Sequence, residues 1–149
     1  MTRGDAAVEL AVELCRDGAV VPRYSRAGDG GMDVVCPVDM VIPAGKTAIV
    51  PTGLKVAVPY GWMLLVFPRS GLSAHTGLRV ANSPGLIDAG YRDEVGIVLH
   101  NTGTEDYALA AGARIAQFVL LHRTEIRFRP VDSVAAIGHN RGGGFGHTG

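Results

Sequence analysis

The chain alternates between apolar and polar side chains over several short segments. Residues 8–14 place an aliphatic side chain at every second position, and residues 95–99 repeat this pattern around Gly96. A two-residue period is typical of a β-strand that buries one face. Apolar or β-branched runs predict further strands at residues 46–51, 54–58, 62–67 and 113–121, and alternation predicts another at 126–128.

Turn-forming residues separate these segments and recur about every ten positions, which is typical of an all-β sandwich or barrel. They lie at residues 43–45, 59–61, 101–103 and 111–112. The pattern leaves room for at most one or two short helices. We predict one helix from residue 71 to residue 76, ended by Gly77, and a second turn near residues 132–136.

Size and charge narrow the class of protein. The 149 residues suffice for one domain with a hydrophobic core. The 14 basic and 14 acidic residues cancel, so we expect no nucleic-acid partner, because broad nucleic-acid binding needs a basic surface. No apolar run is as long as the about 18 residues that a membrane span needs. The first residues also lack the apolar block of a secretory signal. We therefore expect a cytoplasmic protein that does not enter a membrane.

Two features of the composition leave alternatives open. The hydrophobic content of 47% fits either apolar surface buried between subunits or a large core. Cys15 and Cys36 lack zinc-type spacing, so we expect free thiols, either of which could simply be buried.

Residues 82–101 carry the most informative chemistry. They place the carboxylate of Asp88 and the ring of Tyr91 at a glycine-rich bend that leads into the strand at 95–99. Glycines in such a bend let backbone groups approach a flat ligand closely, while Asp88 handles a proton. Two plainer interpretations stay open: Asp88 bonds its own turn, and Tyr91 is a half-buried sheet residue.

Two other segments have the chemistry to hold an anion. Arg69, Ser70 and Gly71 offer a guanidinium, a hydroxyl and backbone N–H groups where the predicted helix begins, although a surface ion pair explains Arg69 equally well. The last nine residues contain five glycines, with Arg141 ahead of them and Phe145 among them. Such a tail is either disordered or a strap that closes over a stacked base.

Five segments in order along residues 20–149 resemble the signatures of the homotrimeric dUTPase family. The third reads Gly-Leu-Ile-Asp-Ala-Gly-Tyr-Arg-Asp-Glu at 85–94, and the others lie at 28–34, 68–72, 112–117 and 142–149. The resemblance implies an all-β fold, a distorted jelly-roll-like β-barrel over residues 1–137, and a flexible glycine-rich arm at 138–149. It also implies a homotrimer with shared active sites, over which the arm of a neighbouring copy closes.

The same resemblance implies a dUTP diphosphatase that uses Mg²⁺. Asp88 would hold the attacking water and the sugar 3′-hydroxyl. Attack on the α-phosphorus yields dUMP and pyrophosphate, which limits uracil in DNA and supplies dUMP for thymidylate synthesis. Tyr91 would lie under the deoxyribose and exclude a 2′-hydroxyl. Asp33, otherwise a turn former, would support Mg²⁺ through water, in keeping with the preference of this ion for few protein carboxylates.

The remaining matched residues would bind the substrate. Backbone groups at Leu86 and Gly96 would read the uracil edge, Asn82 would add its amide, and Ile87 lies in the same segment. Asn82 also suits a plain turn, and Gln117 a solvated strand face. The residues expected at the phosphates and in the arm are Arg69, Ser70, Gly71, Gln117, Arg141 and Phe145.

The sequence departs from the family pattern at three places. Asp93 stands where the third signature has glycine, which adds a charge beside Arg92. Arg141 precedes Phe145 by four residues instead of five, so either Arg141 or Asn140 takes the place of the arginine in the fifth signature. His147 replaces a serine, which would make any phosphate contact there depend on pH.

Two other functions are compatible with a fold of this kind. The sister branch of the family, dCTP deaminase, needs a glutamate at the base and a different arginine-serine signature, and the Asp88–Tyr91 arrangement speaks against it. A dUTPase-like protein that sequesters a regulator usually carries an insert between the motifs, and the sequence has none there.

Overall fold

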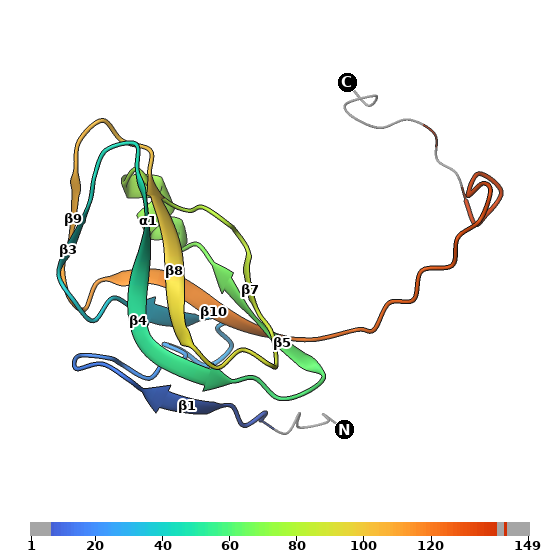
Figure 1. Ribbon diagram of the computed structural model, residues 1–149, viewed down its shortest axis with the longest axis horizontal. Helices are drawn as coiled ribbons and strands as arrows, with labels where there is room; N and C mark the ends of the chain where they lie inside the picture. The colour runs from blue at the N-terminus through green and yellow to red at the C-terminus, as the bar shows by residue number, and fades with distance from the viewer. Residues whose placement is uncertain (1–6, 140–141, 143–149) are drawn as a thin grey trace.

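The computed structural model describes residues 7–139 and 142, in which β-strands dominate and one short helix occurs (Figure 1). The all-β prediction is confirmed, and the short helix falls within one residue of its predicted bounds. The elements are β1 (Ala11–Leu14), β2 (Met32–Val35), β3 (Met40–Ile42), β4 (Thr47–Ala57), β5 (Trp62–Phe67), α1 (Ser70–His75), β6 (Leu78–Val80), β7 (Gly85–Ile87), β8 (Glu94–Asn101), β9 (Tyr107–Leu109) and β10 (Arg114–His122).

The strands form two four-stranded antiparallel sheets in a jelly-roll-like arrangement. One sheet has the order β1-β4-β8-β6 and the other the order β2-β10-β5-β7. Strands β3 and β9 form a separate antiparallel pair. Strands β7 and β8 follow each other in the chain but belong to different sheets, so the loop between them crosses from one sheet to the other.

The core lies between the two sheets and follows from the alternation along β8. Val95, Ile97 and Leu99 are buried, and the residues between them are partly exposed. From the other sheet, Leu64 and Phe118 join the same apolar cluster. Each such side chain contributes about 1.5–3 kcal/mol when it is removed from water, so this cluster fixes the face that each strand presents inward.

Strand β4 joins two predicted strands into one, with an irregularity in the middle. Its pairing with β8 shifts register between Pro51 and Lys55. Gly53 lies there with φ of +70°, a backbone conformation that side chains rarely adopt, and a Cβ on it would approach the Cβ of Ala19 to 2.6 Å. The glycine therefore allows β4 to bend where β8 begins, at Glu94.

After β10 the chain leaves the two sheets. Residues 123–139 contain no helix or strand and extend away from the body (Figure 1). The strand predicted at 126–128 is therefore wrong for a single chain. Ile126 and Phe128 are 71% and 92% exposed, and a strand needs a neighbouring strand to complete its hydrogen bonds.

No helix among the described residues combines the length and apolar character needed to cross a bilayer.

Candidate active site

A cavity of about 180 Å³ lies between β7 and β8 and brings together five of the predicted site residues. Its size falls below the about 300–1,000 Å³ of pockets that hold drug-sized ligands, so it suits one small ring. The predicted residues in its lining are Asn82, Leu86, Ile87, Tyr91 and Gly96, and the others are Val66, Gly85 and Val95.

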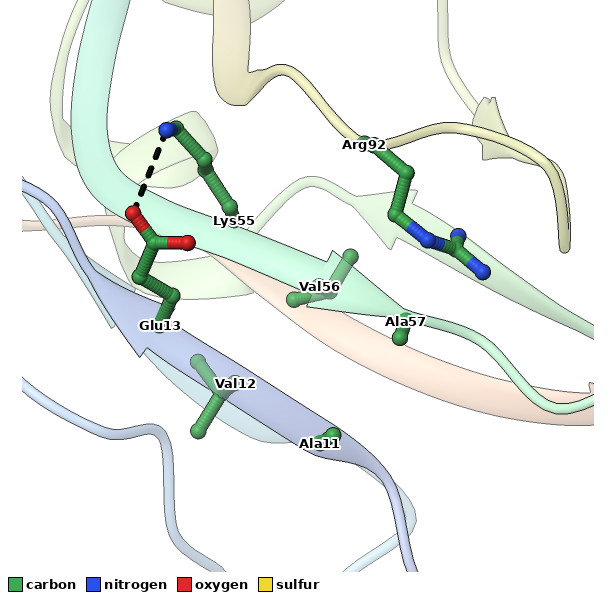
Figure 2. Close-up of a pocket in the computed structure, with 7 residues that line it drawn as sticks. All are labelled: Ala11, Val12, Glu13, Lys55, Val56, Ala57 and Arg92. Carbon is green, nitrogen blue, oxygen red and sulfur yellow. Dashed lines mark hydrogen bonds and ion pairs between the residues drawn. The ribbon is translucent and has the colours of Figure 1, made fainter.

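Two larger cavities, of about 350 and 640 Å³, contain none of the predicted site residues among the described residues that line them. Figure 2 shows the first, which lies between β1, β4 and the loop that carries Arg92. The second is mainly apolar and lies against Trp62 and Phe118. The smaller cavity differs from both in that an aromatic ring, an amide and two strand segments with glycines line it.

The walls of the small cavity depend on glycines. Gly85 pairs with Val66 of β5, and a Cβ on Gly85 would lie 3.1 Å from the Cβ of Val66 and 3.3 Å from the Asn82 amide nitrogen. A Cβ on Gly96 would approach Cγ2 of Ile49 to 2.4 Å. Side chains at these two positions would therefore crowd the cavity walls, and glycine keeps the backbone accessible.

Strand β7 also provides an open backbone edge. It is the last strand of its sheet and pairs with β5 on one side, and within the described residues no strand pairs with its other side. An edge strand presents backbone N–H and C=O groups that need partners. The cavity therefore combines apolar walls with donors and acceptors of the main chain, which suits the edge of a flat base.

The loop between β7 and β8 is a closed turn that carries two of the predicted site residues, Asp88 and Tyr91. The Tyr91 N–H donates to the Asp88 carbonyl at 3.1 Å, and the Tyr91 hydroxyl donates to the Glu94 carbonyl at 2.9 Å. Arg92 Nη1 donates to the carbonyls of Ala89 and Tyr91 at 2.7 Å each. Three hydrogen bonds of side chains to backbone therefore hold this loop, and Tyr91 stays 40% exposed above the cavity.

Asp88 is exposed and directly follows the cavity residue Ile87. Among residues 7–139 and 142, no donor contacts its carboxylate, and only its backbone carbonyl takes part in the turn. The plainer interpretation, in which the Asp88 side chain bonds its own turn, is therefore not what the structure has. A carboxylate with free lone pairs can accept a proton from a water molecule.

A second cluster of predicted residues surrounds the end of β5. Arg69 donates from Nε to Oδ1 of Asp33 at 2.6 Å and from Nη2 to Oδ2 at 3.4 Å. Arg114 Nη1 reaches the same Oδ2 at 3.2 Å. Gln117 donates from Nε2 to the Pro68 carbonyl at 2.9 Å. In the single chain Arg69 is thus in an ion pair, yet part of its guanidinium remains available to an anion.

The sheet register explains why these residues meet. Gln117 of β10 pairs with Asp33 of β2 on one side and with Phe67 of β5 on the other. The three residues form one row across the sheet, and Arg69 lies two residues beyond Phe67. Arg114 lies within the fourth segment at residues 112–117, but the sequence predicts no role for it. The contact of Arg114 with Asp33 depends on this strand pairing, which the sequence does not reveal.

Ser70 and Gly71 begin α1 and are exposed next to Arg69. The first helical hydrogen bond joins the Ser73 N–H to the Arg69 carbonyl at 3.0 Å. The earlier N–H groups of α1 therefore lie outside the helical ladder, as at every helix start. Together with the Ser70 hydroxyl, they give this end of the sheet further donors.

Asp88 and Arg69 lie at opposite ends of β5 in one chain, although the small cavity itself reaches Val66 beside Phe67. Ile87 pairs with Leu64, which places Asp88 beside Met63, and Arg69 follows the far end of the same strand. The four steps along the strand from Met63 to Phe67 span about 13 Å, at about 3.3 Å each. Figure 1 shows α1 at one end of β5 and the β7–β8 connection near the other. A single chain therefore does not bring Asp88 and Arg69 together.

Two of the predicted residues, Arg141 and Phe145, lie outside the described residues, as do Asn140 and His147.

Comparisons with known proteins agree with one another. The model of the dUTPase family matches residues 17–149. The deoxyuridine 5′-triphosphate nucleotidohydrolase of Cutibacterium acnes is 43% identical over 130 residues, which cover 87% of this chain and 85% of that protein. The structure of the Staphylococcus bacteriophage 80alpha dUTPase with dUPNHPP is similar with a TM-score of 0.86 at 25% identity, over 96% of this chain and 99% of that one.

A further solved structure is similar in fold. It is a mutant dUTPase from phage phi11 of S. aureus, described with a structural Mg(II) ion. The TM-score is 0.77 at 24% identity, and the match covers 85% of this chain and 98% of that one.

Proposed function

The chain belongs to the dUTPase family, and we propose that it hydrolyses dUTP to dUMP and pyrophosphate by attack of a water molecule on the α-phosphorus. The observation that carries this proposal is the cavity of about 180 Å³ whose lining residue Ile87 is followed directly by Asp88, an exposed carboxylate that no donor among the described residues contacts. The activity limits uracil in DNA and supplies dUMP for thymidylate synthesis.

Uracil is the ring that this cavity suits. The open edge of β7 around Leu86 offers alternating donors and acceptors, and the glycine at position 96 keeps the opposite wall close to the backbone. The amide of Asn82 adds a group that both donates and accepts. A wall of backbone atoms leaves no space for the methyl group of thymine and offers the wrong partner to the amine of cytosine.

Tyr91 is assigned to the sugar. Its ring lines the cavity, and its hydroxyl is engaged by the Glu94 carbonyl, so the ring has one preferred position. A ring held under the deoxyribose excludes a 2′-hydroxyl by steric overlap. Apolar contact alone discriminates only about 10–200-fold per small group, so exclusion by a fixed ring is the stronger device.

Asp88 is the general base in this proposal. Its carboxylate accepts a proton from the attacking water while a new bond forms between the water oxygen and the α-phosphorus. The bond from that phosphorus to the bridging oxygen breaks, and pyrophosphate leaves with the electron pair. Positioning of this water and neutralisation of the triphosphate account for most of the rate, as in other phosphoryl transfers.

The triphosphate needs the charged end of β5. Arg69, Gln117 and the start of α1 at Ser70 and Gly71 supply donors of the kind that bind phosphate oxygens. Loss of one cationic side chain from such a site weakens binding of the substrate more than it changes the position of the bound substrate.

Mg²⁺ fits this site as an ion held mainly by the triphosphate. No three His, Cys, Asp or Glu side chains gather into a metal cage in the described part of the chain. Asp33 Oδ2 already accepts from Arg69 and Arg114, but Oδ1 accepts only from Arg69 and keeps a second lone pair for a metal-bound water. Bound there, the ion would neutralise phosphate charge, and Asp33 would hold it through water.

We propose that active sites are shared within a homotrimer. The separation of Asp88 from Arg69 along β5 supports this, because an Asp88 and an Arg69 from different copies could then meet at one nucleotide. The exposed apolar side chains of residues 123–139 support an arm that packs on another copy. The arm at 138–149, with Arg141 and Phe145, would complete the site of a neighbour.

This arm can be tested by truncation. A chain that ends at Ile137 is expected to stay folded and trimeric and to lose most of its activity. Light scattering gives the oligomeric state and a pyrophosphate assay gives the turnover. Full activity of the shortened trimer would contradict a role for residues 138–149.

The cytoplasm is the compartment that we propose for this enzyme, without a nucleic-acid or membrane partner. The two free cysteines, one buried and one partly buried, support a reducing environment. The balance of 14 basic and 14 acidic residues supports a small-molecule substrate over a nucleic acid.

The proposed activity is tested with purified full-length chain and four nucleotides. With Mg²⁺ present, dUTP is expected to give pyrophosphate at a rate far above those of dTTP, dCTP and UTP. Removal of Mg²⁺ by a chelator is expected to lower the rate strongly. Ammonia release from dCTP, or equal rates with dUTP and UTP, would contradict the assignment.

A further inference from the structure

Arg16 forms the most closely bonded ion pair outside the two clusters already described, and its partner is Glu94. Arg16 Nε lies 2.6 Å from Oε1 of Glu94, and Nη2 lies 2.7 Å from Oε2. This two-point geometry fixes both planar groups relative to each other. The Glu94 side chain is only 23% exposed, and its Oε1 also accepts the Gly53 N–H at 2.9 Å. The glutamate is therefore held by three donors from two separate segments.

The main chain of Glu94 is bonded to the candidate site. Its carbonyl accepts the Tyr91 hydroxyl at 2.9 Å. The Glu94 side chain thus binds Arg16, and the Glu94 carbonyl binds the hydroxyl of Tyr91. Through Glu94, the segment around Arg16 is linked to the Tyr91 ring. A glutamate whose side chain is fixed at three points has little freedom to rotate its own carbonyl, so the hydroxyl bond of Tyr91 has a fixed acceptor.

The local sequence explains how Arg16 reaches Glu94 across 78 positions of the chain. Strand β1 pairs with β4, and the Cys15 N–H extends this pairing to the Gly53 carbonyl at 2.8 Å. Gly53 lies in the bend of β4, and a Cβ there would come within 3.2 Å of the Arg16 Cβ. The bend thus leaves space for the arginine and places it over the first residue of β8.

We propose that Arg16 is a positioning residue for sugar selection, which acts on the Tyr91 ring through Glu94. The inference rests on the proposed function, in which this ring lies under the deoxyribose. Arg16 precedes residues 17–149, to which the family model extends, so none of the five signatures contains it. Loss of the ion pair frees the Glu94 backbone, and the ring then excludes a 2′-hydroxyl less well.

A neighbouring ion pair provides a matched control. Lys55 Nζ lies 3.1 Å from Glu13 Oε1, and Figure 2 shows this pair joining β4 to β1 beside the cavity that Arg92 also lines. It ties together the same two strands as the segment around Arg16. Its Glu13 makes no bond to Glu94 among the hydrogen bonds of the described residues. Glu13→Gln therefore loosens the same sheet edge and leaves Glu94 in place.

The test compares kcat/KM for dUTP with kcat/KM for UTP in full-length variants. Arg16→Gln is expected to lower this ratio about two- to fivefold, the scale of one lost surface-type pair, with kcat for dUTP nearly unchanged and its KM raised. Arg16→Lys restores part of the ratio, because it keeps the charge but not the two-point geometry. Glu13→Gln keeps the wild-type ratio.

A double-mutant cycle identifies the route. Tyr91→Phe removes the hydroxyl bond to Glu94, so Arg16→Gln is expected to lower the ratio little further in that background. A wild-type ratio in Arg16→Gln, an equal loss in Glu13→Gln, or full additivity with Tyr91→Phe would each overturn the proposal. If Arg16→Gln does not fold, Glu94→Gln serves instead, and an unchanged ratio there overturns the proposal.

The wild-type measurement separates the failure of this proposal from a failure of the proposed function. A wild-type protein that does not hydrolyse dUTP would refute the function itself. If the wild type is active and selective, but its ratio of kcat/KM values does not change in Arg16→Gln, only the positioning role is refuted.

Discussion

Two regions along strand β5 carry different chemistry. The apolar end is the cavity between β7 and β8, which touches β5 at Val66 and is built from apolar side chains, glycines and an open backbone edge. The charged end lies beyond Phe67, where Asp33 joins two arginines and Gln117 bonds the chain at Pro68. In the proposed function, the apolar end selects a ring by shape and main-chain groups, and the charged end neutralises phosphate charge.

This difference shows how each end prepares for its ligand. At the apolar end, Gly85 fits closely against Val66 and Gly96 closely against Ile49. The charged end is held by ion pairs, whose arginines would otherwise repel each other and lose their orientation. We therefore expect substitutions at the apolar end to change selectivity or chemistry, and substitutions at the charged end to change the dependence on Mg²⁺ and phosphate.

The largest expected effect belongs to Asp88. Asp88→Asn keeps the size of the side chain but removes the base, so kcat is expected to fall about 10²–10⁴-fold. Binding of a non-hydrolysable dUTP analogue is expected to stay close to normal, since no other described residue bonds this carboxylate. Stopped-flow turnover and calorimetric binding separate the two. A kcat near that of the wild type would rule out Asp88 as the base.

Asp33→Asn changes the charged end. The amide cannot hold Arg69 and Arg114 by charge, and it is a poorer acceptor for a metal-bound water. We expect a fall of about 10–100-fold in kcat/KM and a higher Mg²⁺ concentration for half-maximal rate, the usual scale for residues that orient metal or its ligands. Arg114→Gln, which removes the longer of the two contacts, is the control with a smaller effect. An unchanged Mg²⁺ titration would contradict the role of Asp33.

Gly85→Ala tests the apolar end by adding one methyl group. The new Cβ would lie 3.1 Å from Val66 and 3.3 Å from the Asn82 amide, so it crowds the cavity from its wall. The KM for dUTP is expected to rise about tenfold, the effect of about 1.4 kcal/mol, with kcat little changed. Gly30→Ala, whose added Cβ meets nothing within 4 Å, is the matched control for packing. Equal KM values in wild type and Gly85→Ala would mean that the base binds elsewhere.

The smallest expected effect concerns the stability that Arg16 gives to the apolar end. The hydrogen bond from Arg16 lowers the pKa of the Glu94 carboxyl below its ordinary value of 4.5. A lowered pKa stabilises the fold above the unfolded-state value, and this contribution is lost as the pH falls through the folded-state pKa. Because Arg16 is half exposed, solvent screens the effect.

The measurement for this effect compares urea midpoints of wild type and Arg16→Gln in steps from neutral pH to about pH 3.5. The two midpoints are expected to differ at neutral pH and to converge in acid. A difference that stays constant over this range would mean that Arg16 stabilises the protein by packing and not by its charge.

Local patterns in the sequence predict much of this architecture. Alternation around residues 95–99 predicts β8, and the glycine at 77 predicts the end of the helix. The cavity residues also follow from the sequence, since most of them lie within the stretch 82–96. In each case the information lies within a few neighbouring positions.

Other features depend on contacts that a single strand pattern does not encode. The predicted strand at 126–128 does not form, because its partner is absent from the chain's own sheets. The pairing of Ile87 with Leu64 sets Asp88 and Arg69 apart, and register is a property of two strands together. The Arg16–Glu94 pair joins positions 78 residues apart, so no motif spacing reveals it.

The most direct test of the shared site is complementation between two inactive variants. Asp88→Asn and Arg69→Gln chains are unfolded together in equal amounts, refolded into mixed trimers and assayed with dUTP. If one copy supplies Asp88 and another supplies Arg69, each residue is intact in half of the copies, so about a quarter of the sites are expected to be active (½ × ½). A mixture no more active than either variant alone would contradict the account.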